Sequence, residues 1–121
     1  MLPIYEKPPE TLKELKERIL ETLNAGWTQK VYAIDKNGHS IDPFSTEAMC
    51  CCLVGAMLRA TYGQGFACQS HYFLHDAGPS GRLRKAFSQK FTEKSKNGMA
   101  TYNDHHTKEE VIAVVESINC D

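Results

Sequence analysis

The sequence lacks an excess of charge of either sign. Its 14 lysines and arginines and 15 acidic residues give a net charge of −1 over 121 residues. That balance gives no general attraction to nucleic acid or to an anionic membrane. No apolar run approaches the roughly 18 residues of a transmembrane helix, and the start lacks the basic and apolar regions of a secretory signal. We therefore expect a cytoplasmic protein, with neither membrane nor nucleic acid among its partners.

The sequence also lacks the paired cysteines of a zinc site. Its five cysteines include three in a row, Cys50 to Cys52, but no CxxC pair. His71 and His75 have the spacing of two ligands on one helix face, which is only half of a zinc site. An odd number of thiols in a reducing compartment is typical of free cysteines that pack as small apolar residues. Since there is no glycine-rich phosphate loop either, we predict no metal and no other cofactor.

The longest mainly apolar stretch is Ser45 to Tyr62, which reads STEAMCCCLVGAMLRATY. At 100° per residue its apolar side chains fall on nearly every side, which predicts a helix in the middle of a domain. We expect Ser45 to cap this helix and Arg59 to reach solvent. Gly55 costs the helix about 1 kcal/mol relative to alanine. Another backbone is therefore expected to approach Gly55 closely.

Three further helices are predicted around this one. They span about residues 9–24, 80–96 and 108–119. Gly26 is placed to end the first in a left-handed conformation. Thr107 and Glu110 form the capping box that starts the last. Residues 99–106 are expected to be a connector.

A short hairpin is predicted between the first helix and the central one. Residues 31–34 have strand composition, and Asn37-Gly38 is typical of a hairpin turn. The two strands would be about 29–35 and 39–41. A hairpin this short needs a helix behind it to be stable.

Together these elements predict a mainly α fold. About four helices would pack around the buried central helix at 45–62, with one small hairpin at about 29–41. The chain is long enough for one core without staples, so we expect a single compact domain, 1–121. Residues 64–97 stand out as a basic insert, because residues 63–98 hold six basic and two acidic side chains.

The basic residues of the 80–96 helix are the candidate partner-binding residues. They are Arg82, Arg84, Lys85, Lys90 and Lys94. Phe87 and Phe91 lie on the same helix at the spacing of core residues, so they do not indicate base stacking. Because no catalytic set stands out, the leading hypothesis is a small non-enzymatic binding or regulatory module acting on a protein partner. The sequence does not indicate the oligomeric state.

A cysteine-dependent enzyme is the first alternative. Cys52 or Cys51 would be the nucleophile and His105 or His106 the base, with Asp104 completing a Cys-His-Asp set. A nucleophilic thiol needs a lowered pKa and some exposure, whereas a thiol packed in the core is inert. The apolar neighbours of these cysteines favour packing.

A small nucleotide-like ligand is the second alternative. Trp27, Gln29 and the basic 80–96 helix would capture it, and the possible pocket would be lined by Trp27, Gln29, Asn103 and Asp104. The structural interpretation of the same residues is simpler, and we favour it. The Trp27 indole N–H would donate to a backbone carbonyl, and Asn103-Asp104 would form a turn.

Several short motifs resemble those of an uncharacterised family of small bacterial and phage proteins. They are Gly26-Trp27-Thr28-Gln29, Asp35 with Gly38, Cys52-Leu53-Val54-Gly55-Ala56, Asn103-Asp104, and Thr107 with Glu110-Val111. The resemblance covers about 11–62 and 99–118, and departs at Cys51, where such sequences often have an aromatic residue. It implies a compact helical domain and no settled activity. It also makes an accessory role reasonable, such as inhibition of a host or defence protein.

Overall fold

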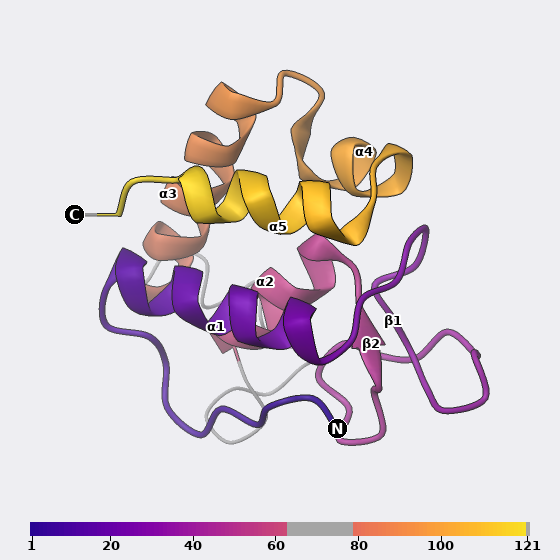
Figure 1. Cartoon of the computed structure of the whole chain (residues 1–121). Coiled ribbons are helices and arrows are strands. Elements are labelled where there is room, and N and C mark those ends of the chain that lie inside the picture. The colour runs from indigo at the N-terminus through magenta and orange to yellow at the C-terminus, as the bar shows by residue number, and fades with distance from the viewer. Residues whose placement is uncertain (63–78, 121) are drawn as a thin grey trace.

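The computed structural model describes residues 1–62 and 79–120 of the chain. In these ranges it contains five helices and two short strands (Figure 1). In order, they are α1 (Leu12–Ala25), β1 (Ala33–Ile34), β2 (Cys50–Cys51), α2 (Leu53–Tyr62), α3 (Pro79–Lys94), α4 (Gly98–His105) and α5 (Lys108–Ser117). The mainly α fold class is confirmed. Residues 64–78 of the predicted insert, with His71 and His75, lie outside the described residues.

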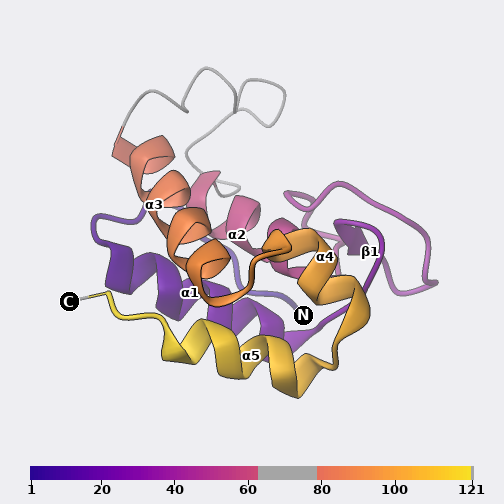
Figure 2. The ribbon, with the colours of Figure 1, turned by 90° about the horizontal axis from the view of Figure 1, so that it is seen from above.

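Helix α2 is the centre of the fold, as predicted. It packs against α1, α3 and α4, and all of its residues except Val54 are buried. In Figure 1, α1 and α5 run side by side across the front, with α2 behind them, α3 to the left and α4 to the right. Figure 2 shows from above how α1, α3 and α4 enclose α2. No helix in the described ranges is long and apolar enough to cross a membrane.

The central helix begins at Leu53 rather than at Ser45, so its predicted start is wrong. Residues 45–49 are not helical and include a turn at 46–47, and the next two residues are extended in β2. The backbone of Cys51 donates at 3.0 Å to segment 26–28 and accepts from it at 3.1 Å, while its other side faces β1. An apolar run cannot distinguish a buried strand from a buried helix, and here backbone pairing with distant segments decides.

The predicted hairpin forms only in part. Its turn is present, because Gly38 has φ of +81° and Ile34 forms an antiparallel bridge with Ser40. The main partner of β1 is nevertheless β2, with Ala33 opposite Cys51. A two-stranded hairpin is marginal in isolation, and the buried β2 supplies a third paired segment.

The other helix boundaries differ modestly from the predictions, apart from α4. Helix α1 begins later because Thr11 caps it, accepting a hydrogen bond from the backbone N–H of Glu14 at 3.0 Å. The predicted connector at 99–106 is wrong, because α4 occupies it. Met99 and Asn103, one helical turn apart, are both buried and fix the inner face of that helix. This face is too short to give a strong periodic signal.

The capping box before α5 is confirmed. The Thr107 hydroxyl accepts from the backbone N–H of Glu110 at 3.2 Å, and the Glu110 carboxylate accepts from the backbone N–H of Thr107 at 2.9 Å. Helix α5 ends at Ser117. There Lys16 of α1 donates to two carbonyls of the α5 end, at 2.9 and 2.7 Å. The two helices are thus joined at this end by a charge that favours a helix C-terminus.

Two glycines allow close backbone contacts. At Gly55 a Cβ would lie 2.1 Å from the carbonyl oxygen of Tyr32, which confirms the expected close approach. At Gly26 a Cβ would lie 2.1 Å from the carbonyl oxygen of Met49. The predicted left-handed conformation of Gly26 is wrong, since its φ is −176°. Its small size, rather than its conformation, is what the fold requires.

Arg59 is buried in α2, so the prediction that it reaches solvent is wrong. Its side chain is only 1% exposed. It donates to the carbonyl oxygen of Pro3 at 2.9 Å, and to those of Pro43 and Ser45 at 2.8 Å each. Burial lowers the pKa of this guanidinium. Arg59 therefore ties the N-terminal segment and the loop before β2 to the central helix.

Candidate functional site

Cys52 lies immediately before α2 and caps it with its thiol. Its Sγ accepts from the backbone N–H of Gly55 at 3.3 Å, and the residue is 6% exposed. Burial raises the pKa of the Cys52 thiol, and the charge of Asp104 raises it further. Cys51 is fully buried, and burial raises its pKa to about 12. Thiols held in the protonated form in this way are poor nucleophiles.

The two candidate bases lie at the C-terminal end of α4. The Nδ1 atoms of His105 and His106 are each 2.8 Å from a carbonyl oxygen one turn earlier, on Thr101 and Tyr102 respectively. The His106 ring also stacks on Tyr102, with centroids 3.7 Å apart. Among the described residues, neither histidine is hydrogen-bonded to Cys52. The part of the chain that the structure describes therefore holds no hydrogen-bonded pair between Cys52 and either of these imidazoles.

The residues proposed to line a pocket do come together, around the side chain of Asn103. This side chain is fully buried on α4. Its Oδ1 accepts from the Trp27 indole N–H at 2.8 Å and from the backbone N–H of Leu53 at 3.0 Å. Its Nδ2 donates to the carbonyl oxygen of Thr28 at 3.1 Å. Trp27 is thus anchored by a side chain rather than a backbone carbonyl, and Asn103 lies on a helix rather than in a turn.

Gln29 and Asp104 extend this arrangement. The Gln29 amide donates to the carbonyl oxygens of Asn103 at 3.1 Å and His106 at 3.0 Å. Asp104 accepts from the backbone N–H of Lys30 at 2.8 Å. We call the set Trp27, Gln29, Asn103 and Asp104 the asparagine junction. Its polar atoms bond to one another and to nearby backbone, so its evident effect is to fasten segment 26–30 to α4 and to the start of α2.

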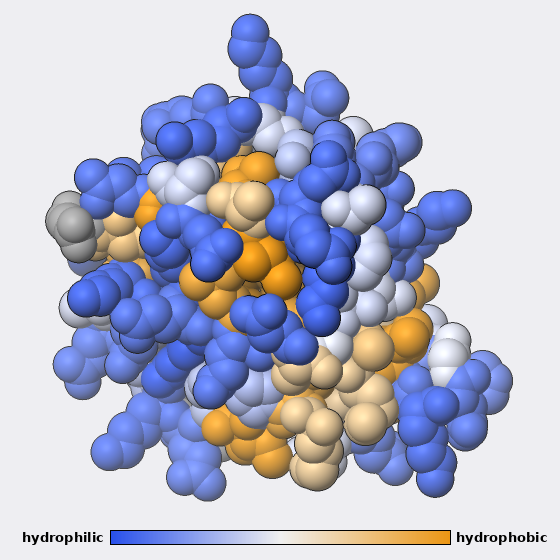
Figure 3. Space-filling view, in the orientation of Figure 1, coloured by the Kyte–Doolittle hydropathy of each residue, from blue (hydrophilic) through white to orange (hydrophobic). Residues whose placement is uncertain are grey.

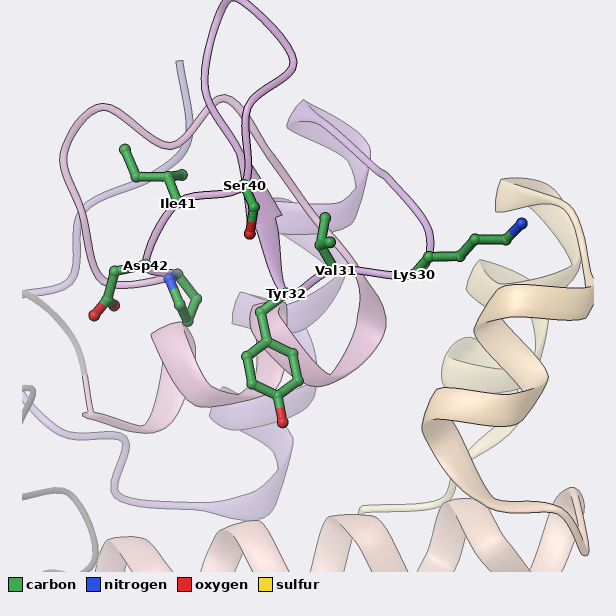
Figure 4. Close-up of a pocket in the computed structure, with 7 residues that line it drawn as sticks. Lys30, Val31, Tyr32, Ser40, Ile41 and Asp42 are labelled. Atoms are coloured by element: carbon green, nitrogen blue, oxygen red, sulfur yellow. The ribbon is translucent and has the colours of Figure 1, made fainter.

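A groove lies beside the asparagine junction, on the outer side of β1 (Figure 4). We call it the edge groove. Its volume is about 720 Å³, and it is bordered by residues 30–32 and 40–43. Tyr32 is 52% exposed there, one of the few large apolar side chains to be so exposed among the described residues. Sequence reasoning missed this groove. The available signals were an aromatic residue beside a strand and the Asp42-Pro43 step after the hairpin.

The five basic candidates lie on α3, as predicted, but not on one face. The exposed ones are Arg82, Lys85 and Lys94, and Lys90 is half-buried. Arg84 is two positions, about 200°, around the helix from Arg82. It points toward the core, where its Nε donates to the Tyr62 hydroxyl at 3.3 Å. Arg84 is therefore partly a structural residue.

The remaining cations of α3 are not neutralised within the described part of the chain. The two ion pairs found there, Arg18–Glu14 at 3.8 Å and His39–Asp35 at 3.9 Å, involve other elements. Glu93 is the single acidic residue of α3. Figure 3 shows a different face, across α1 and α5, which is mostly hydrophilic with an apolar area where the two helices meet.

Comparison with known proteins places the chain in a family. Residues 4–118 match a family of unknown function, DUF6197. The chain belongs to DUF6197. This confirms the membership of an uncharacterised family that the motifs indicated, and the DUF6197 match includes every candidate residue described above. No curated protein and no solved structure matches the chain.

Proposed function

We propose that the protein is a non-enzymatic binding module that docks an acidic surface of a partner protein against α3. The observation that carries the proposal is the set of exposed cations without acidic partners among the described residues. They are Arg82, Lys85 and Lys94. Phe87 and Phe91 are fully buried and hold the helix on the core, so these charges are presented on a fixed support. Complementary charge of this kind speeds encounter and selects partners.

An inhibitory role is a special case of this proposal. Docking through α3 requires no catalytic group on this protein. It inhibits the partner whenever the docked protein covers the partner's active or binding site. The resemblance to bacterial and phage proteins supports a host or defence protein in the cytoplasm as the partner class. We keep this narrower role within the same proposal, since α3 would make the contact in either case.

The test is capture of proteins from bacterial lysate by three forms of the chain, after nuclease treatment of the lysate. The forms are the wild type, a triple variant with Arg82, Lys85 and Lys94→Glu, and a control with Lys7, Lys13 and Lys36→Glu. The triple variant leaves Arg84 in place, because Arg84 bonds to Tyr62. The control makes the same change of net charge at exposed lysines outside α3.

The expected result is an acidic protein captured by the wild type and the control, lost from the triple variant, and released by raised salt. Equal capture by all three forms would contradict the proposal. Capture from untreated lysate that is lost from nuclease-treated lysate would also contradict it. Circular dichroism and the melting temperature show whether the variants remain folded.

The cysteine-enzyme alternative has a separate test. An enzyme requires one thiol that is labelled rapidly at neutral pH, whereas Cys51 and Cys52 are buried with raised pKa. We expect a thiol reagent to label these two only as fast as the protein unfolds. Rapid labelling of Cys52 in the native protein, slowed by His105→Ala, would revive the enzyme hypothesis.

A further inference from the structure

Helix α5 carries a charge opposite to that of α3. Glu109, Glu110 and Glu116 are exposed on it, and no ion pair within the described ranges involves them. The single cation of α5 is Lys108, which donates to the carbonyl oxygen of Asn24 at 3.4 Å and so points toward α1. The outer side of α5 is therefore a row of negative charge that no neighbouring side chain of the described chain neutralises.

Helix α3 lies next to α5 and presents the complementary charge. The two helices contact each other, and both lie on the side of the molecule that Figure 2 shows. Arg82 and Lys85 are exposed on α3, yet neither forms an ion pair with a glutamate of α5 in the same copy. Within the described part of the chain, pairing of these two sets of charges therefore requires a second copy.

We propose that two copies of this chain form a two-fold dimer in which α3 of each copy docks on α5 of the other. The inference rests on the docking role proposed above for α3, and here α5 supplies the acidic surface. Adjacent patches of opposite charge are self-complementary under two-fold symmetry, because each copy then forms both contacts. The net charge of −1 also leaves no strong general repulsion between copies.

The size and polarity of the two helices limit the strength of this dimer. Helix α5 has 10 residues and α3 has 16, which correspond to about 15 and 24 Å. Two contacts of this length between exposed charges give a small, polar interface of the weak and transient class. Salt screens such contacts, so it should dissociate the dimer. The dimer covers α3 in the unbound protein, and an acidic partner protein displaces the second copy by competing for α3.

The experiment measures the mass of the full chain by sedimentation equilibrium, in reducing buffer, with matched pairs of charge reversals. The α3 pair is Arg82→Glu with Lys85→Glu, the α5 pair is Glu109→Lys with Glu116→Lys, and the control pair is Lys7→Glu with Lys36→Glu. The control pair changes exposed lysines outside α3 and has the same net charge as the α3 pair. Glu110 is left in place because its carboxylate accepts from the backbone N–H of Thr107 in the capping box.

We expect the wild type and the control pair to approach twice the monomer mass of 13.6 kDa at about 1 mM protein and low salt. About 0.5 M salt should return both to the monomer. The α3 pair and the α5 pair should each stay monomeric, because like charges then meet at both contacts. An equimolar mixture of these two variants should form a heterodimer, since every contact is again between opposite charges.

A wild type that stays monomeric at every concentration would overturn the inference. So would a mass that keeps rising beyond the dimer, or a mixture that does not associate although the melting temperatures show both variants to be folded. These results are separate from the lysate test. A monomeric wild type that still captures an acidic protein through α3 would contradict the dimer alone. A dimer that forms as expected, together with equal lysate capture by all three forms, would contradict only the proposed function.

Discussion

The indole N–H of Trp27 donates to the Oδ1 of Asn103 at 2.8 Å, across 76 positions of the chain. The same oxygen accepts the first free backbone N–H of α2, on Leu53. A single buried amide thus joins the segment after α1, the start of the central helix and α4. Several consequences can be measured.

Replacement of Asn103 by alanine should destabilise the fold by about 3 kcal/mol, because it leaves buried donors on Trp27 and Leu53 without an acceptor. Urea unfolding at neutral pH gives the free energy. Asn24→Ala is the control, since Asn24 is exposed and its side chain bonds only the Leu20 carbonyl within its own helix. Equal losses in the two variants would show that the asparagine junction does not stabilise the fold.

Replacement of Gly55 by alanine should destabilise by about 3 kcal/mol. The new methyl group would lie 2.1 Å from the Tyr32 carbonyl oxygen, so α2 and the residue that precedes β1 would have to separate. Gly38→Ala provides the comparison, since it meets no atom within 4 Å but must adopt φ of +81°. Its cost should be only about 1 kcal/mol. Thermal unfolding ranks the two, and the reverse order would contradict the packing described for Gly55.

Lys30→Gly should stabilise the protein by about 1 kcal/mol. Lys30 is the single non-glycine residue with positive φ, 72°, in the described ranges, and glycine adopts that conformation without strain. Lys36→Gly removes a similar exposed side chain where the backbone is not left-handed, and should destabilise slightly. If both variants lose stability equally, the strain at Lys30 is negligible.

Stability should fall in alkaline solution. The pKa of Cys51 is about 12 in the folded protein, against 9.0 when exposed. A raised pKa means that folding favours the protonated thiol, so its contribution is intact below about pH 9 and is lost progressively between about pH 9 and 12. Burial also raises the pKa of Tyr5, which acts in the same direction.

Urea unfolding across this pH range measures the slope of stability against pH. Cys51→Ala should flatten the slope without removing it, because Tyr5 still titrates. The comparison is of slopes, since the substitution itself leaves a cavity and lowers stability at every pH. An unchanged slope in Cys51→Ala would show that this thiol is not held protonated by the fold.

Features that depend on neighbouring residues were predictable from the sequence. The capping box of Thr107 and Glu110 involves positions three apart, and the structure contains it. The close contact at Gly55 was predictable because glycine weakens the interior of a helix, and close approach of a second backbone offsets that cost. The mainly α class followed from periodic apolar residues in the same way.

Features that depend on distant pairing were not predictable. Cys50 and Cys51 have the apolar character of a buried helix, and only pairing with segment 26–28 and β1 makes them a strand. The partner of Trp27 could not be identified as Asn103 without the fold. The edge groove lies between residues 30–32 and 40–43, and no local pattern reveals that these two segments border one space.

The position of Asn103 also bears on how the protein is made. A ribosome synthesises residues 1–102 before this side chain exists, and until then the Trp27 indole, the Thr28 carbonyl and the Leu53 N–H lack their partner. The nascent chain can collapse around α1 and α2, but it cannot complete the arrangement that fixes them. This arrangement is therefore completed only when α4 has emerged from the ribosome, and chains truncated before α4 should be recognised as incomplete by cellular quality control.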